Sequence, residues 1–167
     1  DDQITGNEAF NVLRGAAGND TLTGIGASGD QLDGGPGQDS LQGSTGRDLL
    51  TGGSGKDTID GGEGIDYLDY SAPDPADRPE VVRQGVRVDL TLGTAQDNWG
   101  DTDTLRNIED VAGSPLDDLI TGDGRYNELF GLAGNDTLIG SGAAGDRLDG
   151  GTGNDSLLGG DGNDWMK

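Results

Sequence analysis

The chain has 167 residues, a net charge of −22, and neither cysteine nor histidine, and aromatic residues make up 4% of it. An apolar fraction of 30% with so few aromatic side chains excludes a large globular core, and the excess of acids makes nucleic acid and anionic membranes poor partners. No segment is apolar enough to span a bilayer, and the usual nitrogen and sulfur ligands of zinc are missing.

Residues 1–69 are built from a nine-residue unit, Gly-Gly-x-Gly-x-Asp-x-apolar-x. Two consecutive copies are GGSGKDTID at 52–60 and GGEGIDYLD at 61–69. Earlier copies are less regular: Asn11 takes the place of Asp in one, and the unit at 24–33 has one extra residue. Self-similarity at a fixed period is the signature of a repeat fold. We therefore predict a first repeat array over residues 1–69.

Each unit is expected to form a tight turn followed by a very short strand. Its glycines permit positive φ, and the Asp-x-apolar-x end leaves about three strand residues, of which the middle side chain points away from its neighbours. Two units make an 18-residue coil, and stacked coils make a parallel β-roll. The side chains predicted inside are Ile4, Leu13, Leu22, Leu32, Leu41, Leu50, Ile59, Leu68, Ile120, Leu129, Leu138, Leu148, Leu157 and Met166.

Residues 70–112 interrupt the repeats and are predicted to link two arrays. YSAPDPADRPEVVRQ at 70–84 contains three of the five prolines of the chain, which predicts a surface loop because proline is excluded from the interior of a sheet. VRVDLTL at 86–92 alternates apolar and polar residues, as a conventional strand does.

The stretch at 93–114 combines acids with apolar residues. Leu105, Ile108 and Val111 indicate a short strand or an irregular turn of the same solenoid. DNWGDTD at 97–103 has three acids and is a candidate for a separate calcium loop. It lacks the spacing and the terminal Glu of an EF-hand, so the sequence favours a solvated acidic loop.

A second array is predicted over 113–167. Residues 1–51 match residues 117–167 at a constant offset of 116, and Asn127 stands where Asn11 does. The chain is therefore expected to be one period of about 116 residues and part of the next, which makes it a fragment of a longer protein with several such blocks. We predict an all-β fold with two stacked arrays joined by a non-repeat segment.

The stacking of coils predicts columns of carboxylates. Asp39 and Asp57 are 18 residues apart and are expected roughly 4.8 Å apart on one edge, where two like charges repel by roughly 3–4 kcal/mol at an effective dielectric of about 20. Carboxylates with turn carbonyls form an all-oxygen ligand set, which favours Ca²⁺ over zinc or magnesium. Roughly 8–10 Ca²⁺ ions would nearly neutralise the chain.

Folding is expected to depend on that metal. Burying one Leu or Ile per unit returns less free energy than ordering nine residues costs. We infer that metal binding completes the folding free energy, and that the chain is mostly disordered without it.

The repeated phrase resembles the nonapeptide of RTX (repeats-in-toxin) proteins, a calcium-binding repeat. The nonapeptide blocks, joined by a YSA…VDL…NIE segment, are similar to the repeat blocks of the adenylate cyclase toxin and of giant RTX adhesins. The resemblance covers nearly the whole chain. It implies a right-handed, calcium-loaded β-roll that folds outside the cell after type I secretion. The C-terminal secretion signal of that system is not visible here.

Carried over position by position, the resemblance implies metal ligands at the sixth position of each unit and at the turn glycines. The acidic ligands are Asp20, Asp30, Asp39, Asp48, Asp57, Asp66, Asp118, Asp136, Asp146, Asp155 and Asp164, with Asn11 and Asn127 as weaker neutral ligands. The glycines are Gly35, Gly37, Gly53, Gly55, Gly62, Gly64, Gly151 and Gly153. The best pairs are 20/39, 30/48, 39/57, 48/66, 136/155 and 146/164. Four ninth-position acids are either solvated or reach the next ion: Asp33, Asp60, Asp69 and Asp149.

The favoured function is a folding and structural module of a larger secreted toxin or adhesin, located outside the cell or on a bacterial surface. Dissociation constants of roughly 10⁻⁴–10⁻³ M, typical of extracellular modules, suit a calcium switch, and loading along a solenoid should be cooperative. Its expected partners are calcium ions and flanking RTX blocks, with a glycan or cell-surface target open and no nucleic acid. The isolated fragment is expected to be a monomer.

Three other functions are weighed against this one. A polysaccharide- or surface-binding accessory module of an extracellular enzyme would need an exposed basic or aromatic track, but the basic residues are scattered and the aromatics few. Ice binding would need a regular outward row of Thr, for which Thr21, Thr58 and Thr137 are too sparse. An enzyme is not expected, because the sequence has no nucleophile with a recognisable base.

Overall fold

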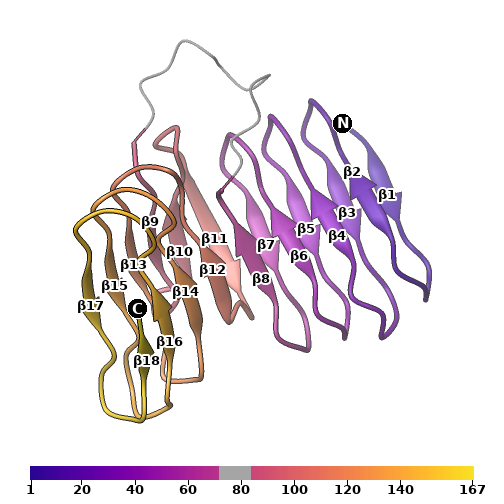
Figure 1. The fold of residues 1–167 in the computed structure, drawn as a ribbon. Helices are drawn as coiled ribbons and strands as arrows, with labels where there is room; N and C mark the ends of the chain where they lie inside the picture. The colour runs from indigo at the N-terminus through magenta and orange to yellow at the C-terminus, as the bar shows by residue number, and fades with distance from the viewer. Residues whose placement is uncertain (72–83) are drawn as a thin grey trace.

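The computed structural model describes residues 1–71 and 84–167, and these form a solenoid of short strands without a helix. The strands lie in two sheets that face each other across a narrow core (Figure 1). Most of the surface loop predicted at 70–84, residues 72–83, lies outside the described residues. Within the described ranges, no helix is present that is long and apolar enough to cross a membrane.

Sheet A has ten strands in the order β1-β3-β5-β7-β11-β10-β9-β13-β15-β17. Their bounds are β1 (Gln3–Thr5), β3 (Thr21–Thr23), β5 (Ser40–Gln42), β7 (Thr58–Asp60), β9 (Arg87–Asp89), β10 (Thr94–Gln96), β11 (Thr102–Arg106), β13 (Leu119–Thr121), β15 (Thr137–Ile139) and β17 (Ser156–Leu158). Sheet B has eight strands in the order β18-β16-β14-β12-β8-β6-β4-β2. Their bounds are β2 (Val12–Arg14), β4 (Gln31–Asp33), β6 (Leu49–Thr51), β8 (Tyr67–Asp69), β12 (Asp110–Ala112), β14 (Glu128–Phe130), β16 (Arg147–Asp149) and β18 (Trp165–Met166).

The coil predicted from the nine-residue unit is confirmed. Strands of one array pair in parallel with a register shift of 18 or 19 residues, as in Leu41↔Ile59 and Leu22↔Leu41. In the central coils the middle residue of each three-residue strand is buried and its neighbours are more exposed, as in Thr58–Asp60. The alternation arises because successive side chains of a strand point to opposite faces.

The core is a double row of aliphatic side chains, one from each strand. All the predicted inward residues are fully or nearly fully buried except three at the ends of the solenoid. Ile4 and Leu157 are partly buried, and Met166 is 51% exposed. Each lies in a terminal coil, which has a neighbour on one side only.

The segment between the arrays contains a three-stranded antiparallel insertion in sheet A. Strand β10 pairs antiparallel with both β9 and β11, whereas in sheet B β8 pairs directly and in parallel with β12. The strand predicted at 86–92 is shorter than expected. It ends at Asp89, whose Oδ1 accepts from Leu92 N, and the chain turns at Gly93 with φ of 67°. Leu92 is therefore 73% exposed.

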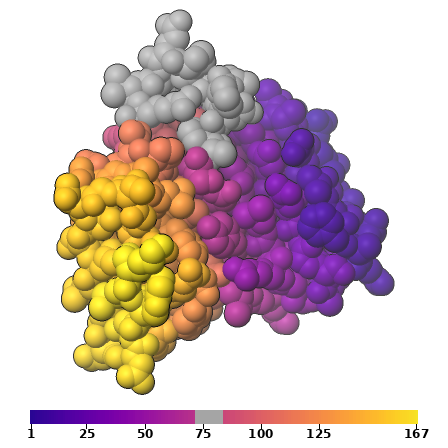
Figure 2. All heavy atoms as spheres, viewed as in Figure 1, coloured from indigo at the N-terminus to yellow at the C-terminus, as the bar shows by residue number. Residues whose placement is uncertain are grey.

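The remaining apolar residues of this segment behave as predicted. Leu105 lies in β11 and Val111 in β12, and both are buried, as is Ile108 in the intervening turn. Strands β9–β12 therefore continue the core between the arrays. The N-terminal array (indigo to magenta) and the C-terminal array (orange to yellow) occupy opposite sides of the molecule in Figures 1 and 2.

Candidate metal sites

The sixth-position aspartates lie at the end of each turn, and most are buried. An Asp two residues before an inward-pointing Leu or Ile points to the same side of the chain, so its carboxylate faces the inside of the turn. Asp66 is 0% exposed and Asp57 2%. The other buried members are Asp20, Asp30, Asp39, Asp48, Asp118, Asp136 and Asp146. Asp155 and Asp164, in the last two units, are half-buried.

One oxygen of each carboxylate is bound by the backbone of the preceding coil. The N–H of Asp39 donates to Asp57 Oδ1 at 2.8 Å. The same contact joins the other five predicted pairs: 20/39 at 2.7 Å, 30/48 at 2.5 Å, 48/66 at 2.9 Å, 136/155 at 3.0 Å and 146/164 at 2.8 Å. The structure therefore brings together all six pairs that the sequence singles out.

The second oxygen is buried and, in several coils, is not hydrogen-bonded. Within the described residues no hydrogen-bond partner is found for the Oδ2 atoms of Asp20, Asp30, Asp57, Asp66, Asp136 and Asp146. A buried carboxylate oxygen without a partner is costly. Each such oxygen is a position where a cation would be stabilised.

Backbone carbonyls surround the same positions. A Cβ built on Gly15 would lie 2.6 Å from Asp20 Oδ2 and 2.7 Å from the carbonyl oxygen of Gly34 in the next coil. Carboxylate and carbonyl oxygens thus meet at the space above the first glycine of the unit. This donor set fits a hard cation such as Ca²⁺.

The glycines named from the sequence shape these turns. Gly35 and Gly53 have φ of 90° and 100°, a conformation that glycine adopts without strain. A Cβ on Gly53 would overlap the carbonyl oxygen of Gly35 in the preceding coil, so the stacked turns leave no room for a side chain. The other six glycines named in the sequence analysis also have positive φ: Gly37, Gly55, Gly62, Gly64, Gly151 and Gly153.

Burial and like charge raise the pKa of Asp57 and Asp66, which lie in these columns. Burial raises the pKa of Asp57 to about 7, and the charges of Asp39 and Asp97 add to the effect. Burial raises the pKa of Asp66 to about 6, with Asp48 and Glu109 adding to it. Without a nearby positive charge these carboxylates are thus unfavourable as anions.

In two of the units that have a serine in place of the second glycine, the second oxygen has a partner. Ser44 N donates to Asp48 Oδ2 at 2.6 Å, and Ser114 N donates to Asp118 Oδ2 at 2.5 Å. Asp118 also accepts from Val86 N at 2.7 Å through Oδ1. These two carboxylates have backbone donors on both oxygens.

The two asparagines bond to their surroundings through both ends of the amide. Asn127 Oδ1 accepts from Asp123 N, and its Nδ2 donates to the carbonyl of Glu109 at 2.8 Å. Asn11 Nδ2 donates to Asn7 O and to Asp30 Oδ1, each at 2.9 Å. Their role as weaker metal ligands stays a prediction.

Two residues that the sequence analysis did not name as ligands continue the columns of acids. Asp57 N donates to Asp103 Oδ1 at 3.0 Å, and Asp66 N donates to Glu109 Oε2 at 3.0 Å. The first column therefore runs Asp20, Asp39, Asp57, Asp103, and the second column runs Asp30, Asp48, Asp66, Glu109. The signal in the sequence was an acid two residues before a buried aliphatic residue, as in Asp103–Leu105 and Glu109–Val111.

The interpretation of 97–103 as a solvated acidic loop was wrong. Asp97 is 0% exposed, Asn98 2% and Asp103 1%. The reason is the pairing of β11 with β7, which places this loop against the turn that ends at Asp57. Within this loop Gly100 and Thr102 are exposed.

The side chains of the ninth-position acids point to the outer faces and interact with residues close to them in space. Asp60 Oδ1 accepts from Asn107 Nδ2 at 2.8 Å, and Asp69 Oδ1 accepts from Ser71 N at 2.8 Å. Asp149 lies 3.5 Å from Lys167 Nζ, and Asp33 lies 3.9 Å from Arg14 Nε. Across 1–71 and 84–167 no three acidic side chains gather closely enough to hold one ion, so each candidate site combines carboxylates with backbone carbonyls.

The fold and this donor set define a class of protein, the metal-binding β-solenoids built from short glycine-rich coils. The model of the RTX calcium-binding nonapeptide repeat matches residues 1–24, 26–68, 113–144 and 141–166, and the chain belongs to this family. These repeats bind calcium, so Ca²⁺ is the cofactor that the buried oxygens fit. No curated protein matches the chain.

Proposed function

We propose that this chain is a calcium-dependent folding module of a larger toxin or adhesin that is exported by type I secretion and matures outside the cell. The observation that carries the proposal is the row of buried carboxylate oxygens that have no hydrogen-bond partner among the described residues, as at Asp57 and Asp66. Family membership supports calcium as the ion and an extracellular location.

The proposed ligands are the six aspartate pairs and the carbonyls of the turn glycines. Bound Ca²⁺ would supply the positive charge that these buried oxygens lack. Each pair joins neighbouring coils, as Asp39 and Asp57 do. Binding in one coil therefore orders part of the next site, which predicts cooperative loading.

The difference in calcium concentration between the two sides of the cell envelope would then act as the switch. Extracellular modules bind Ca²⁺ with dissociation constants of about 10⁻⁴–10⁻³ M. At the much lower cytosolic level the chain stays unfolded, and outside the cell it folds. We assign no catalytic role to this chain, and we propose that as an isolated fragment it is a monomer with flanking repeat blocks as its natural neighbours.

We further propose three structural units along the chain: a first array at 1–69, a block linker at 70–112 and a second array at 113–167. The inserted strands β9–β11 fall within the linker. Limited proteolysis at intermediate Ca²⁺ concentrations tests the division, because cleavage within 70–112 should release two stable fragments.

Circular dichroism during calcium titration tests the folding switch. The chain in excess chelator should give a disordered spectrum, and Ca²⁺ but not Mg²⁺ should produce a cooperative transition to β-structure. Asp57→Asn should shift the midpoint to higher Ca²⁺, because it removes a buried ligand. Glu63→Gln, which removes an exposed charge from the neighbouring turn, is the matched control. A fully folded chain in chelator would contradict the proposal.

A second candidate function is glycan or surface binding, and one observation favours it. Four of the aromatic residues gather on the outer face of sheet B rather than being scattered. Tyr67 and Phe130 have ring centroids 6.2 Å apart, and Arg147 lies 5.0 Å from the centroids of both Phe130 and Trp165. Tyr126, 44% exposed, precedes β14 at the same face. Exposed aromatic rings beside charged groups suit stacking against sugar rings.

Affinity electrophoresis in gels containing alginate or a soluble β-glucan tests this candidate at saturating Ca²⁺. Retardation that is lost in Trp165→Ala would support it. Phe10→Ala, which removes an exposed aromatic residue of the first array, is the control. Equal migration with and without polysaccharide would contradict glycan binding of these two classes.

A further inference from the structure

The acidic loop at 97–103 occupies the place of a repeat turn beside Asp57. Strand β11 pairs in parallel with β7 in the register Leu105↔Ile59, which is the pairing that successive coils of an array have. Asp57 N donates to Asp103 Oδ1 at 3.0 Å, as Asp39 N does to Asp57 Oδ1. A segment outside the nonapeptide pattern thus completes the coil.

Asp103 nevertheless differs from Asp57 and Asp66, because both of its oxygens are hydrogen-bonded. Its Oδ2 accepts from the hydroxyl of Tyr70 at 2.9 Å, and Tyr70 is itself buried. The oxygen that remains without a partner in Asp57 or Asp66 is therefore already bound in Asp103.

Asp97, in the same loop, has a buried oxygen without a partner among the described residues. Its Oδ1 accepts from Trp99 N at 2.9 Å and from Asp101 N at 2.8 Å, so the loop wraps around its own first carboxylate. Its Oδ2 is buried, and in the described part of the chain it has no hydrogen-bond partner. The side chain is 0% exposed, so water does not satisfy this oxygen.

The charges of Asp57 and Asp97 act on each other across the junction. After burial itself and the charge of Asp39, the negative charge of Asp97 is among the causes that raise the pKa of Asp57 to about 7. Burial likewise raises the pKa of Asp97 to about 6, with Asp101 adding to it. The pairing of β11 with β7 and the hydrogen bond from Asp57 N to Asp103 Oδ1 place the loop that carries Asp97 against the turn that carries Asp57.

A surface hollow adjoins the junction. It has a volume of ≈ 400 Å³ and is lined by Ser54, Gly55 and Lys56 of the turn and by Asp101 of the loop. Asp57 and Asp97 do not line it and are buried, so the hollow brings a hydrated cation to the outer side of the turn and the loop.

We propose that Asp57 and Asp97, together with carbonyls of the turn at 52–57, hold a Ca²⁺ ion at the junction, at a site that the nonapeptide pattern does not contain. This ion would join the last coil of the first array to the inserted strands, so that calcium also fixes the linker on the solenoid. The proposal adds a site to the calcium module and is independent of its secretion.

Terbium luminescence tests the site, because Tb³⁺ replaces Ca²⁺ and emits when a nearby tryptophan is excited. Trp99 lies two residues from Asp97, whereas Trp165 lies on the outer face of sheet B. In Trp165→Phe protein, Trp99 is the only tryptophan, and excitation should give Tb³⁺ emission that Ca²⁺ displaces. Asp97→Asn in that background should reduce the emission at least five-fold, and Glu63→Gln should leave it unchanged.

Equilibrium dialysis against ⁴⁵Ca²⁺ measures the number of Ca²⁺ ions bound per chain. Asp97→Asn should bind one Ca²⁺ fewer than the parent chain, with an unchanged calcium-induced circular dichroism transition in the arrays. An unchanged count with unchanged Tb³⁺ emission would overturn the junction site and leave the folding switch intact. If Asp97→Asn does not fold at saturating Ca²⁺, the test is Tb³⁺ emission from the folded Trp165→Phe protein. Absence of emission sensitised by Trp99 in that protein would overturn the site.

Discussion

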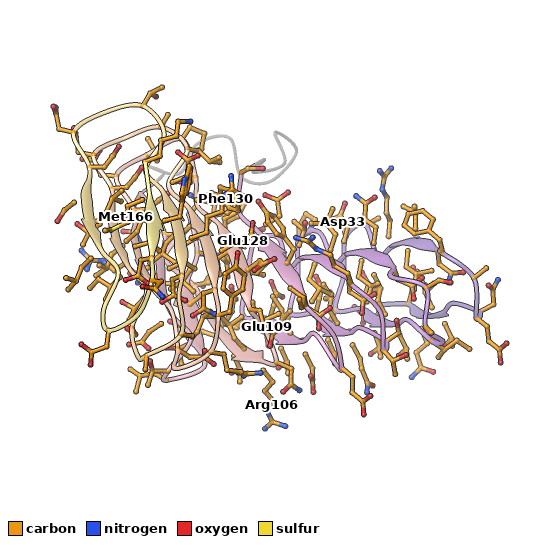
Figure 3. All side chains as sticks on the ribbon, turned by 60° about the horizontal axis from the view of Figure 1, so that its bottom comes forward. Asp33, Arg106, Glu109, Glu128, Phe130 and Met166 are labelled. Carbon is orange, nitrogen blue, oxygen red and sulfur yellow. The ribbon has the colours of Figure 1, made fainter. Side chains whose placement is uncertain are left out.

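Arg125 Nη1 lies 2.8 Å from Glu109 Oε1, at the point where the second column of acids passes from one array to the other. Glu109 follows Asp66 in that column and lies between the two arrays (Figure 3). The next sixth-position residue is the neutral Asn127, which binds the carbonyl of Glu109. The guanidinium of Arg125 thus provides positive charge beside Glu109. The neutral Asn127 stands where a regular repeat has a second carboxylate.

Arg125→Gln is expected to lower the free energy of unfolding by about 1 kcal/mol, because Arg125 is half exposed while Glu109 is largely buried. Urea denaturation at saturating Ca²⁺ measures this change in the free energy of unfolding. Arg14→Gln is the control, since Arg14 is more exposed and its nitrogen lies 3.9 Å from Asp33; its effect should be below about 0.5 kcal/mol. Equal effects of the two changes would contradict a special role for Arg125.

Substitution by alanine should distinguish strand side chains that point into the core from those that point to solvent. Leu41→Ala should destabilise the calcium-loaded protein by about 2–5 kcal/mol, because Leu41 is 1% exposed within the double row. Leu158→Ala removes a side chain that is 60% exposed and should cost less than about 1 kcal/mol. Thermal or urea unfolding at fixed Ca²⁺ gives both values, and a similar loss in both variants would mean that the strand faces are misassigned.

The close stacking of turns predicts that one added methyl group is not tolerated. A Cβ on Gly37 would overlap the carbonyl oxygen of Gly18, a backbone atom that cannot move independently. Gly37→Ala should therefore raise the calcium concentration at the folding midpoint several-fold. Gly124→Ala is the matched control, because nothing lies within 4 Å of its added Cβ, and it should be neutral or stabilising by about 0.4–1 kcal/mol.

Acid should stabilise the fold in the absence of calcium. Burial raises the pKa of Asp57 to about 7 and those of Asp66 and Asp118 to about 6, above the unfolded value of about 4. Between pH 4 and 7 the folded chain therefore binds more protons than the unfolded chain, so stability rises as pH falls through this window.

Circular dichroism in chelator should accordingly show more β-structure at pH 5 than at pH 8. With Ca²⁺ present the dependence should reverse, since protons compete with the ion for the same oxygens, and the calcium midpoint should increase below pH 6. Asp57→Asn should weaken the response in chelator. An apo chain whose spectrum is the same at pH 5 and pH 8 would contradict the raised pKa values.

The repeats could be predicted from the sequence because spacing alone determines them. Asp39, Asp57 and their aliphatic partners recur with nearly constant separation, so strand, register and pairing follow from counting residues. The junction could not be predicted in this way. There β7 pairs with β11, more than 40 residues further along the chain, and β10 runs antiparallel, so sequence separation no longer indicates which strands are neighbours.

The same limitation explains the errors at particular residues. Asp97 and Asp103 were predicted to be solvated because their stretch lacks the spacing and terminal Glu of an EF-hand, but the turn ending at Asp57 buries them. Met166 was predicted to lie inside because it is in phase, but burial also requires a neighbouring coil on each side, and Met166 is 51% exposed.

The hydrogen bonds that join the six aspartate pairs all have the same direction along the chain. In each pair the amide belongs to the earlier coil and the carboxylate to the later one, as in Asp39 N to Asp57 Oδ1. Loss of an aspartate therefore leaves a donor unsatisfied in the coil before it. If the C-terminal end emerges and folds first, each newly added coil finds a carboxylate already in position for its amide. If the N-terminal end emerges and folds first, the amide of the newest coil has no carboxylate until the next coil folds.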